Sequence, residues 1–334
     1  MSKVTMQDIA DALNVSRISV WKALTNRPGI SDSLRQQVLA KAAAMGYTAS
    51  ERAPARPRGK RTFAVAVARP ESSMFWMQII HHAAKELSAY DINLMYTYMP
   101  TASRPGYELP SSLDAGAVDG FLVLNVYDPE LLSLLTGSPL PRVFLDTIPS
   151  LPPERLGGDL MMLEGRCSVC EITDRLFERG FRRLGFIGDV NYAQTNTDRY
   201  NGFLDAHAAH GLPVDPALCM TGPLGLSSHY EEISAFLDSL GELPDAFVCP
   251  SDFIAHFIRR YLTERGVQRQ PLLTGFDNNA EYANVAGQIT TVDVDTSALG
   301  RRLARQLIYR ADYPDAPYET TYFSTHILYR GALA

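Results

Sequence analysis

Three helical patterns follow one another closely in residues 4–47, and this spacing restricts the segment to a small all-α unit. Thr5, with Asp8 three residues later, marks the start of a first helix, since a hydroxyl caps free backbone N–H groups and an acid favours the first turn. Ser16 and Ser31 have the same cap position for two further helices, and Gly46 ends the third. Two short helices joined by so tight a turn predict a helix-turn-helix, whose second helix lies in the major groove of DNA.

Charge divides the 334-residue chain just beyond this unit. Residues 1–61 contain 11 Lys and Arg against 4 Asp and Glu, whereas the remainder contains 20 basic and 33 acidic residues. The basic segment suits DNA phosphates, and the acidic body would be repelled by them. We therefore expect double-stranded DNA to be a partner of residues 1–61; a basic segment that only maintains solubility is the alternative.

The remaining composition argues against a membrane protein, a metalloprotein and a common enzyme. No apolar run approaches the roughly 20 residues of a membrane span, and we expect no signal peptide. Glycine-rich phosphate loops and nucleophile motifs are absent from the sequence. Cys167 and Cys170 have metal or redox spacing, but without a second ligand pair nearby we interpret them as buried reduced thiols. We expect a cytoplasmic protein without cofactor, metal site or catalytic residues.

From Phe63 onward, apolar runs typical of buried strands alternate with helical stretches. Repeated strand–helix units predict parallel sheets covered on both faces, with ligands bound at the carboxyl ends of the strands. The expected strands are 63–68, 92–97, 119–125, 142–146, 183–188, 245–249 and 272–276, and the expected helices are 74–89, 162–179, 197–210, 229–240, 251–265 and 295–310.

An ordered set of motifs spreads over nearly the whole chain. The N-terminal motifs are Val-Thr-Met-Gln-Asp-Ile-Ala-Asp-Ala-Leu-Asn-Val-Ser, followed by Ser-Val-Trp-Lys-Ala-Leu and Met-Gly-Tyr. The motifs of the body are residues 118–121, 179–188, 199–203, 251–252, 275–278 and 289–292. Each motif alone is weak, but their order and spacing are specific, and in this set the chain resembles the LacI/GalR family of bacterial transcription regulators.

The resemblance implies a small all-α helix-turn-helix domain followed by an α/β periplasmic-binding-protein-like core of two doubly wound subdomains. The headpiece would span 1–48, a basic proline-rich linker 49–62 and the core 63–334. The N-subdomain would comprise about 63–157 and 293–320, and the C-subdomain about 158–290 and 321–334, with chain crossings near 157–160, 290–293 and 319–322.

The resemblance also implies a homodimer, because two headpieces must reach the two half-sites of a near-palindromic operator. Residues 75–90 would contribute to the dimer contact. The alternative is that the apolar side chains of these residues only cover the sheet.

By family position, Arg17, Ile18 and Lys22 would read bases. Arginine and lysine bind the acceptors of guanine, and isoleucine contacts the thymine methyl group. Trp21 replaces a small polar residue of the family, and whether it faces DNA or joins the helical core stays open. Further DNA contacts, mainly to phosphates, are expected from Thr5, Ser16, Ser19 and Ser31.

The linker departs from the family, whose members commonly have an Asn-x-x-Ala-Arg-x-Leu hinge helix with a minor-groove leucine. Here Arg56 replaces that leucine and Pro54 interrupts the helix. Residues 56–61 instead resemble an AT-hook, an extended peptide that places arginine in a narrow A·T minor groove. We expect Arg56, Arg58 and Lys60 to bind DNA in this way, and a flexible tether with nonspecific charge is the alternative.

Five positions match the effector cleft of the family: Phe75, Asp146, Arg199, Ser251 and Asp277. Two carboxylates, an arginine and an aromatic face suit a polyhydroxylated ligand, so a sugar or sugar derivative is the expected effector. The alternatives are that Asp146 and Asp277 act only as helix caps, and that Arg199 forms an interdomain ion pair. Ser251 replaces the asparagine common in the family.

Together these features predict a sequence-specific transcription regulator, expected to be a repressor, whose operator affinity is controlled by a small-molecule effector. Induction and corepression are both compatible with the sequence. The competing functions are a cytoplasmic sugar-binding protein and a sugar-acting enzyme that uses the same cleft.

Overall fold

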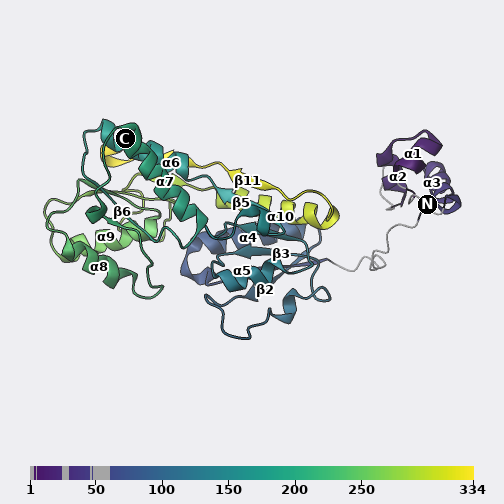
Figure 1. Cartoon of the computed structure of the whole chain (residues 1–334), viewed down its shortest axis with the longest axis horizontal. Coiled ribbons are helices and arrows are strands. Elements are labelled where there is room, and N and C mark those ends of the chain that lie inside the picture. Colours follow the sequence, from purple (N-terminus) through teal and green to yellow (C-terminus); the bar gives the residue numbers. More distant parts are fainter. Residues whose placement is uncertain (1–3, 5, 25–29, 46, 48–60) are drawn as a thin grey trace. The chain divides into compact units, whose positions relative to one another are not determined.

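The computed structural model describes residues 4, 6–24, 30–45, 47 and 61–334, without the side chains of residues 7, 17, 18, 21 and 72. The chain divides into two compact units, a headpiece unit of residues 1–59 and a core unit of residues 60–334 (Figure 1). Among the described residues, no helix is both long and apolar enough to cross a membrane.

The headpiece unit contains three helices: α1 (Met6–Leu13), α2 (Arg17–Leu24) and α3 (Asp32–Ala44). Ser16 and Ser31 cap the second and third helices, as their Oγ atoms accept hydrogen bonds from the backbone N–H groups of Ser19 at 3.0 Å and Leu34 at 3.2 Å. Tyr47 packs against the small core between the helices. That core consists of Ile9, Ala10, Val20, Ala23, Val38 and Ala42.

The core unit begins with a six-stranded parallel sheet, in the order β11-β5-β4-β3-β1-β2. We call this sheet and the helices that cover it the N-lobe. Its strands are β1 (Thr62–Val67), β2 (Asn93–Tyr98), β3 (Phe121–Leu124), β4 (Arg142–Leu145), β5 (Asp159–Leu163) and β11 (Thr320–Phe323), and its helices are α4 (Met74–Ala89), α5 (Pro129–Thr136) and α10 (Thr296–Asp312).

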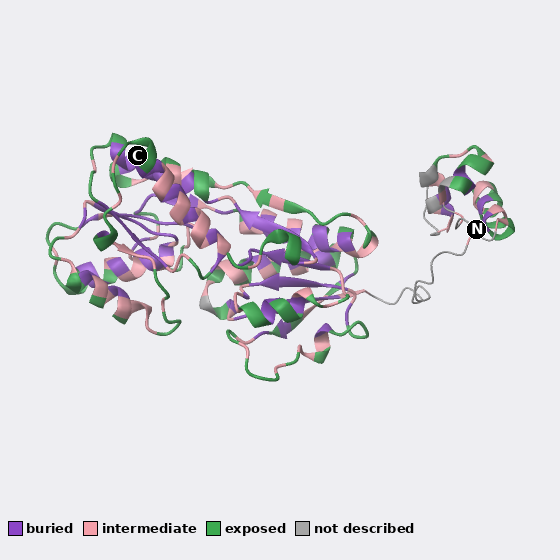
Figure 2. Cartoon of the chain, viewed as in Figure 1, coloured by how far each residue is buried: buried purple, intermediate pink, exposed green. Residues whose placement is uncertain are grey.

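Alternation along β1 explains the layers of the N-lobe. Val65 and Val67 pack in one apolar cluster with residues of α4 and α10, whereas Ala64 and Ala66 pack in a second cluster with residues of α5. Because neighbouring strand residues point to opposite faces, the all-apolar strand is buried on both sides. Figure 2 shows the inner strands β1, β3, β4 and β5 as buried, whereas the edge strands β2 and β11 and the outer helix faces are largely exposed.

A second parallel sheet, in the order β7-β6-β8-β9, forms the C-lobe with its helices. A short antiparallel pair, β10 and β12, completes the core unit. The elements are β6 (Leu184–Ile187), β7 (Cys219–Met220), β8 (Ala246–Val248), β9 (Leu272–Thr274), β10 (Thr291–Asp293), β12 (His326–Leu328), α6 (Arg166–Glu178), α7 (Gln194–Ala209), α8 (His229–Ser239) and α9 (Asp252–Glu264).

Strand pairing moves the lobe boundaries a few residues from their predicted positions. Residues 159–163 and 320–323 form β5 and β11 of the N-lobe sheet, although the sequence analysis assigned 158–163 and 321–323 to the C-subdomain. The predicted helix 162–179 correspondingly begins only at Arg166, after β5 ends at Leu163. The chain therefore crosses between the lobes after β5, after β10 and after β11.

A buried ion pair holds β5 to α10. Arg310 donates to Asp159 from Nη2 to Oδ1 at 2.6 Å and from Nε to Oδ2 at 3.0 Å, and both side chains are at most 2% exposed. The same carboxylate accepts a hydrogen bond from the backbone N–H of Glu319, just before β11. This contact fixes the edge of the N-lobe sheet where the chain makes its last crossing.

Candidate ligand-binding cleft

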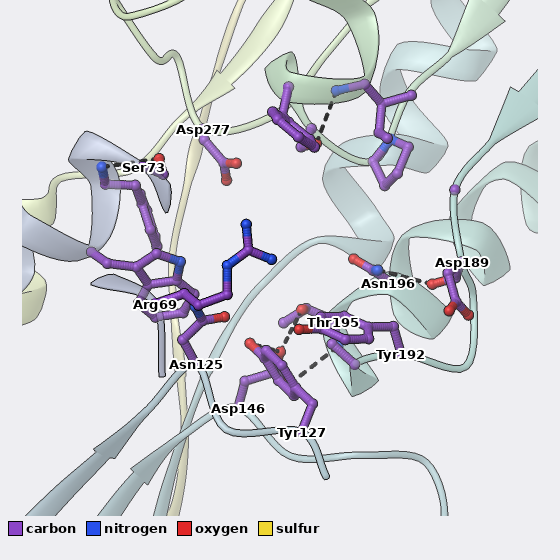
Figure 3. Close-up of a pocket in the computed structure, with 18 of the residues that line it drawn as sticks. Arg69, Ser73, Asn125, Tyr127, Asp146, Asp189, Tyr192, Thr195, Asn196 and Asp277 are labelled. Atoms are coloured by element: carbon purple, nitrogen blue, oxygen red, sulfur yellow. Dashed lines mark hydrogen bonds between the residues drawn. The ribbon is translucent and has the colours of Figure 1, made fainter. Parts of the chain in front are cut away.

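One cavity, of about 250 Å³, lies where the strands of both lobes end, and we call it the cleft (Figure 3). Asn125 follows β3 and Asp146 follows β4 from the N-lobe, and Pro250 and Asp277 lie beyond the ends of β8 and β9 from the C-lobe. Ligands of parallel α/β sheets bind at these carboxyl ends because neighbouring loops diverge there. All five predicted effector residues, Phe75, Asp146, Arg199, Ser251 and Asp277, line the cleft. Their contact with a ligand stays a prediction.

Left-handed backbone is concentrated at the strand ends around the cleft. Arg69, Asn125, Asp146 and Asp277 have φ angles of 44°, 55°, 72° and 93°. Asn and Asp tolerate this conformation through local hydrogen bonds, whereas a long side chain such as arginine rarely adopts it. Strained positions of this kind gather at binding sites because they direct side chains into them.

Asp146 joins the two lobes with its carboxylate. Its Oδ2 atom accepts a hydrogen bond from the Thr195 hydroxyl at 2.6 Å, and Oδ1 accepts from the Thr195 backbone N–H at 3.2 Å. Thr195 lies in the first turn of α7, whose cap residue Ala193 has no polar side chain. Asp146 thus supplies the missing cap from the opposite lobe, as the cap alternative for this residue had suggested.

The rest of the Asp146 carboxylate is also occupied. Tyr127 donates from its hydroxyl to Oδ2 at 3.2 Å, and the Thr147 N–H donates to Oδ1 at 2.8 Å. Burial raises the pKa of Asp146, while the hydrogen bonds from Thr195 and Thr147 and the charge of Arg199 oppose the rise. The geometry therefore favours a role in the contact between lobes over direct ligand recognition.

In a second contact between the lobes, the C-lobe supplies the acceptor and the N-lobe supplies the helix start. Glu281 of the C-lobe accepts a hydrogen bond from the backbone N–H of Met74, the first residue of α4, at 3.1 Å. The Nδ2 atom of Asn279 donates to the Ser73 hydroxyl at 3.1 Å. Each lobe therefore provides acceptors for the start of a helix in the other.

Arg199 is fixed within the C-lobe. Its Nη1 atom donates to the Pro250 carbonyl at 2.6 Å, and its guanidinium lies 3.6 Å from the centroid of the Phe276 ring. Asp277 is its ion-pair partner, with Nη2 and Oδ1 3.9 Å apart. Burial raises the pKa of Asp277, and Arg199 partly offsets that rise. Because all these residues belong to the C-lobe, Arg199 does not form the interdomain ion pair that was its alternative role.

Ser251 begins α9, and its Oγ atom accepts a hydrogen bond from the Ile254 N–H at 3.4 Å. Its neighbour Asp252 points away from the cleft lining, where it accepts hydrogen bonds from the Thr291 hydroxyl and the Asn279 N–H. Burial raises the pKa of Asp252 to about 7, and the nearby charge of Asp277 adds to the rise.

Sequence reasoning missed most of the aromatic lining. Tyr127 of the N-lobe and Tyr192 of the C-lobe have ring centroids 4.8 Å apart and meet across the cleft. Such flat apolar surfaces beside a few polar groups are typical of small-molecule sites. Tyr127 follows a predicted strand, so its place at a strand end could have identified it as a lining residue. Tyr192 lies in a loop whose sequence has no pattern that predicts a binding site. The other missed aromatic or cationic lining residues are Arg69, Trp76, His229, Phe253 and Tyr282.

The predicted DNA contacts are only partly described by the structure. Arg17, Ile18 and Lys22 lie on α2, and of these only the side chain of Lys22 is described, as half-buried. Ser16 and Ser19 lie at the start of α2 with their hydroxyl oxygens 2.9 Å apart. Thr5, Arg56, Arg58, Lys60 and the side chain of Trp21 lie outside the described residues.

The cysteines are less buried than predicted. Cys167 is exposed, Cys170 and Cys219 are half-buried, and only Cys249 is fully buried. Burial, with the adjacent Asp174 carboxylate, raises the pKa of Cys170 to about 11, which disfavours a metal-binding or nucleophilic thiolate. Among the described residues, no cluster of three His, Cys, Asp or Glu side chains could hold a metal ion.

Comparison with known proteins gives consistent matches along the chain. A family model described as a periplasmic binding protein-like domain matches residues 173–333. The chain is 26% identical over 324 residues to the HTH-type transcriptional repressor PurR of Mannheimia succiniciproducens, covering 95% of this chain and 94% of that protein.

Two solved structures are similar over the full length. One is a transcriptional regulator CelR–cellobiose complex, with 22% identity and a TM-score of 0.70 over 99% of this chain and 100% of that chain. The other is the Lac repressor dimer bound to operator and the anti-inducer ONPF, with 16% identity and a TM-score of 0.64 over 99% of each chain. These matches confirm the prediction of a periplasmic-binding-protein-like α/β core.

Proposed function

We propose that the chain is a member of the LacI/GalR family of bacterial transcription regulators. It is a dimeric, sequence-specific regulator, acting as a repressor, whose DNA affinity is set by a sugar-like effector. The observation that carries the proposal is one chain with a cationic three-helix headpiece unit and a core with a cleft between two lobes. Its DNA target places the protein in the cytoplasm.

The headpiece unit supplies the features of a DNA reader. Helix α2 follows α1 after a turn of three residues, and Asn14 in that turn has a φ of 54°. Helices in this arrangement place the second helix in the major groove. Arg17 and Lys22, both on α2, are the proposed guanine readers, and the excess of basic residues up to residue 61 supplies the attraction to phosphates.

The cleft supplies the features of an effector site. Carboxylate, guanidinium, amide and hydroxyl groups face it between aromatic rings, which suits a ligand with several hydroxyl groups and an apolar face. The similar solved structure is a complex of the regulator CelR with the sugar cellobiose, and we extend that ligand class to this chain.

Contacts between lobes provide a mechanism of control. The Asp146–Thr195 and Glu281–Met74 hydrogen bonds require the two lobes to be close together. A ligand that touches both lobes binds this arrangement more tightly and raises its population. A dimer then converts the lobe rearrangement into a change of headpiece spacing, which alters operator affinity.

A homodimer is part of the proposal because two half-sites require two headpieces. Met74 and Met77 on α4 are 51% and 45% exposed, unusually high for large apolar side chains on a helix that also covers the sheet. We place the dimer contact on this face of α4. Light scattering of the wild-type protein and of Met77→Glu tests it, with loss of the dimer expected in the variant.

DNA selection from random duplexes, repeated with a panel of sugars, tests the regulator proposal. We expect enrichment of a near-palindromic sequence, salt-sensitive binding, and a change in affinity with one class of sugar. Arg17→Ala should weaken binding by about 1–3 kcal/mol and relax the preference at one base of each half-site.

The two competing functions predict other results. A sugar-binding protein or a sugar-acting enzyme that uses the cleft would bind sugars without selecting any DNA sequence. Lack of sequence enrichment and of DNA retardation even at low salt would exclude the regulator.

A further inference from the structure

Arg69 has an unusual backbone for its residue type. It follows Ala68 at the end of β1, with φ 44° and ψ 52° in the left-handed region. This conformation costs an arginine free energy because its Cβ crowds the backbone, and the residue has no local side-chain hydrogen bond in compensation. The three other strand-end residues with positive φ around the cleft are Asn or Asp, which tolerate it.

The Arg69 side chain points into the cleft, as Figure 3 shows. The structure gives it no hydrogen bond or ion pair with any described residue, although it is partly buried. Arg199, the other arginine of the cleft, is by contrast committed to Pro250, Phe276 and Asp277. A guanidinium stays charged at all physiological pH values, so a partly desolvated one without a partner favours an anion.

Two groups of the C-lobe lie close to the Arg69 charge. Burial raises the pKa of Tyr192 and lowers that of His229, and the charge of Arg69 opposes the first shift and adds to the second. Both Tyr192 and His229 line the cleft. His229 is the first residue of the 11-residue helix α8, whose cap residue Ser228 makes no side-chain cap. The positive end of that helix therefore adds to the attraction for an anion.

The acidic groups of the cleft leave this position available. Asp277 pairs with Arg199, and Asp146 is occupied by Thr195 and Tyr127. The charge of Asp189 acts on Tyr192, and the Oδ1 atom of Asp189 accepts a hydrogen bond from the Asn191 N–H at 3.0 Å. The Asn125 amide donates from Nδ2 to the Ala68 carbonyl at 2.7 Å, which leaves its oxygen for a ligand hydroxyl.

We propose that the effector is an anionic sugar derivative, whose phosphate or carboxylate group binds Arg69 of the N-lobe together with Tyr192 and His229 of the C-lobe. The hydroxyl groups of the sugar then face Asn125 and Asp277. The inference rests on the proposed function and narrows its ligand class from sugars in general to charged ones. Because the anionic group contacts both lobes, it also stabilises the arrangement in which they are close.

Calorimetric titration of the full-length protein with matched probes tests this inference. The probes are glucose, glucose 6-phosphate and glucuronate, then cellobiose, maltose and trehalose with their 6-phosphates. We expect at least one phosphate or carboxylate form to bind about tenfold or more tightly than its neutral parent, a difference of about 1.4 kcal/mol. The phosphate and carboxylate series distinguish the two sources of the charge.

Variants assign the effect to Arg69. Arg69→Met should remove the preference for the charged probe over its neutral parent, and Arg69→Lys should retain part of that preference. Arg104→Met, at an exposed arginine outside the cleft lining, is the matched control and should behave as the wild type. Inorganic phosphate at constant ionic strength should raise the melting temperature of the wild type more than that of Arg69→Met.

The inference is overturned if neutral sugars bind as tightly as their charged forms, or if Arg69→Met binds the charged probe with wild-type affinity. It is equally overturned if no charged probe binds and phosphate stabilises both proteins to the same extent. Binding to the selected DNA without ligand is measured in parallel. If the wild type selects no DNA but still prefers charged sugars through Arg69, the regulator function fails while the ligand class stands.

Discussion

The Asp146 carboxylate accepts two hydrogen bonds from Thr195, one from its hydroxyl and one from its backbone N–H, and thereby caps the first turn of helix α7 in the opposite lobe. This bond set depends on the distance between lobes, because Asp146 follows β4 and Thr195 lies on α7. Substitutions at either residue therefore test how the contact between the lobes contributes to stability and ligand binding.

Thr195→Val should weaken the arrangement in which the lobes are close. The substitution removes the hydroxyl donor and leaves part of a buried carboxylate unsatisfied, at a cost of about 1–3 kcal/mol in the free energy of unfolding. Effector affinity should fall as well, while DNA binding without effector changes in the direction opposite to the effector's own. Thr263→Val is the control, since that exposed threonine bonds only within α9, to the Arg259 carbonyl. Equal stability of the two variants would contradict the role of Asp146–Thr195.

Arg310→Met should strongly destabilise the N-lobe. It leaves the Asp159 carboxylate buried without its cation, which costs about 3–5 kcal/mol. Denaturant unfolding measures the loss, and the double variant with Asp159→Asn should recover much of it because neither charge then remains. Arg305→Met breaks the more exposed pair with Glu86 and should cost far less, because solvent screens that pair. A small loss for Arg310→Met would show that the buried pair is dispensable.

Asp252 should make stability depend on pH. Its pKa in the folded protein is about 7, above the unfolded value of about 3.9, so folding takes up a proton between these values. The contribution of protonated Asp252 to the free energy of unfolding is therefore fully present below about pH 4. It is lost as the pH rises through about 7. Unfolding of the wild type and of Asp252→Asn at a series of pH values tests this.

In Asp252→Asn the decline between pH 4 and 7 should become shallower. Glu154→Gln, at an exposed carboxyl group, should retain the wild-type slope and serves as the control. Parallel curves for the wild type and Asp252→Asn would show that Asp252 is already ionised in the folded protein at low pH.

Arg58→Ala distinguishes the two interpretations of the linker. An extended, AT-hook-like contact predicts loss of minor-groove protection and of A·T preference at the operator centre. A flexible tether predicts uniformly weaker binding to all sequences, with the salt dependence reduced by about one phosphate contact. Footprinting on the selected operator and on a variant with a G·C centre separates them, and Arg104→Ala controls for loss of a positive charge elsewhere.

The sequence alone predicts those helices and strands whose apolar pattern has a single interpretation. The run Phe63–Ala68 is entirely apolar and too short for a helix, and it forms the buried strand β1. Residues 159–163 were not predicted as a strand: residues 162–163 were assigned to the following helix and residues 159–161 to no element, because a short apolar run that precedes a helix lacks a period of its own. Only pairing with β4 and the bond from Asp159 to Arg310, 151 residues away, decides that this segment is a strand.

The same distinction applies to the cleft. Asp146 and Asp277 follow predicted strands, so the rule that ligands bind at the carboxyl ends of strands places both in the cleft lining. Arg69 also follows a predicted strand, but its role depends on a left-handed backbone that the sequence does not reveal. Tyr192 lies in the loop between β6 and α7, and His229 is the first residue of α8. Both come close to Arg69 because the two lobes lie against each other.

Because each lobe supplies acceptors for a helix of the other, these contacts affect how lobes of similar proteins can be recombined. Asp146 serves α7 from the N-lobe, and Glu281 serves the start of α4 from the C-lobe. A chimera that joins one lobe of this chain to the other lobe of a relative therefore retains only one of the two residues in each contact. The graft should keep its stability only when the incoming lobe has an acid at the equivalent position, so these two positions set the compatibility of transplanted lobes.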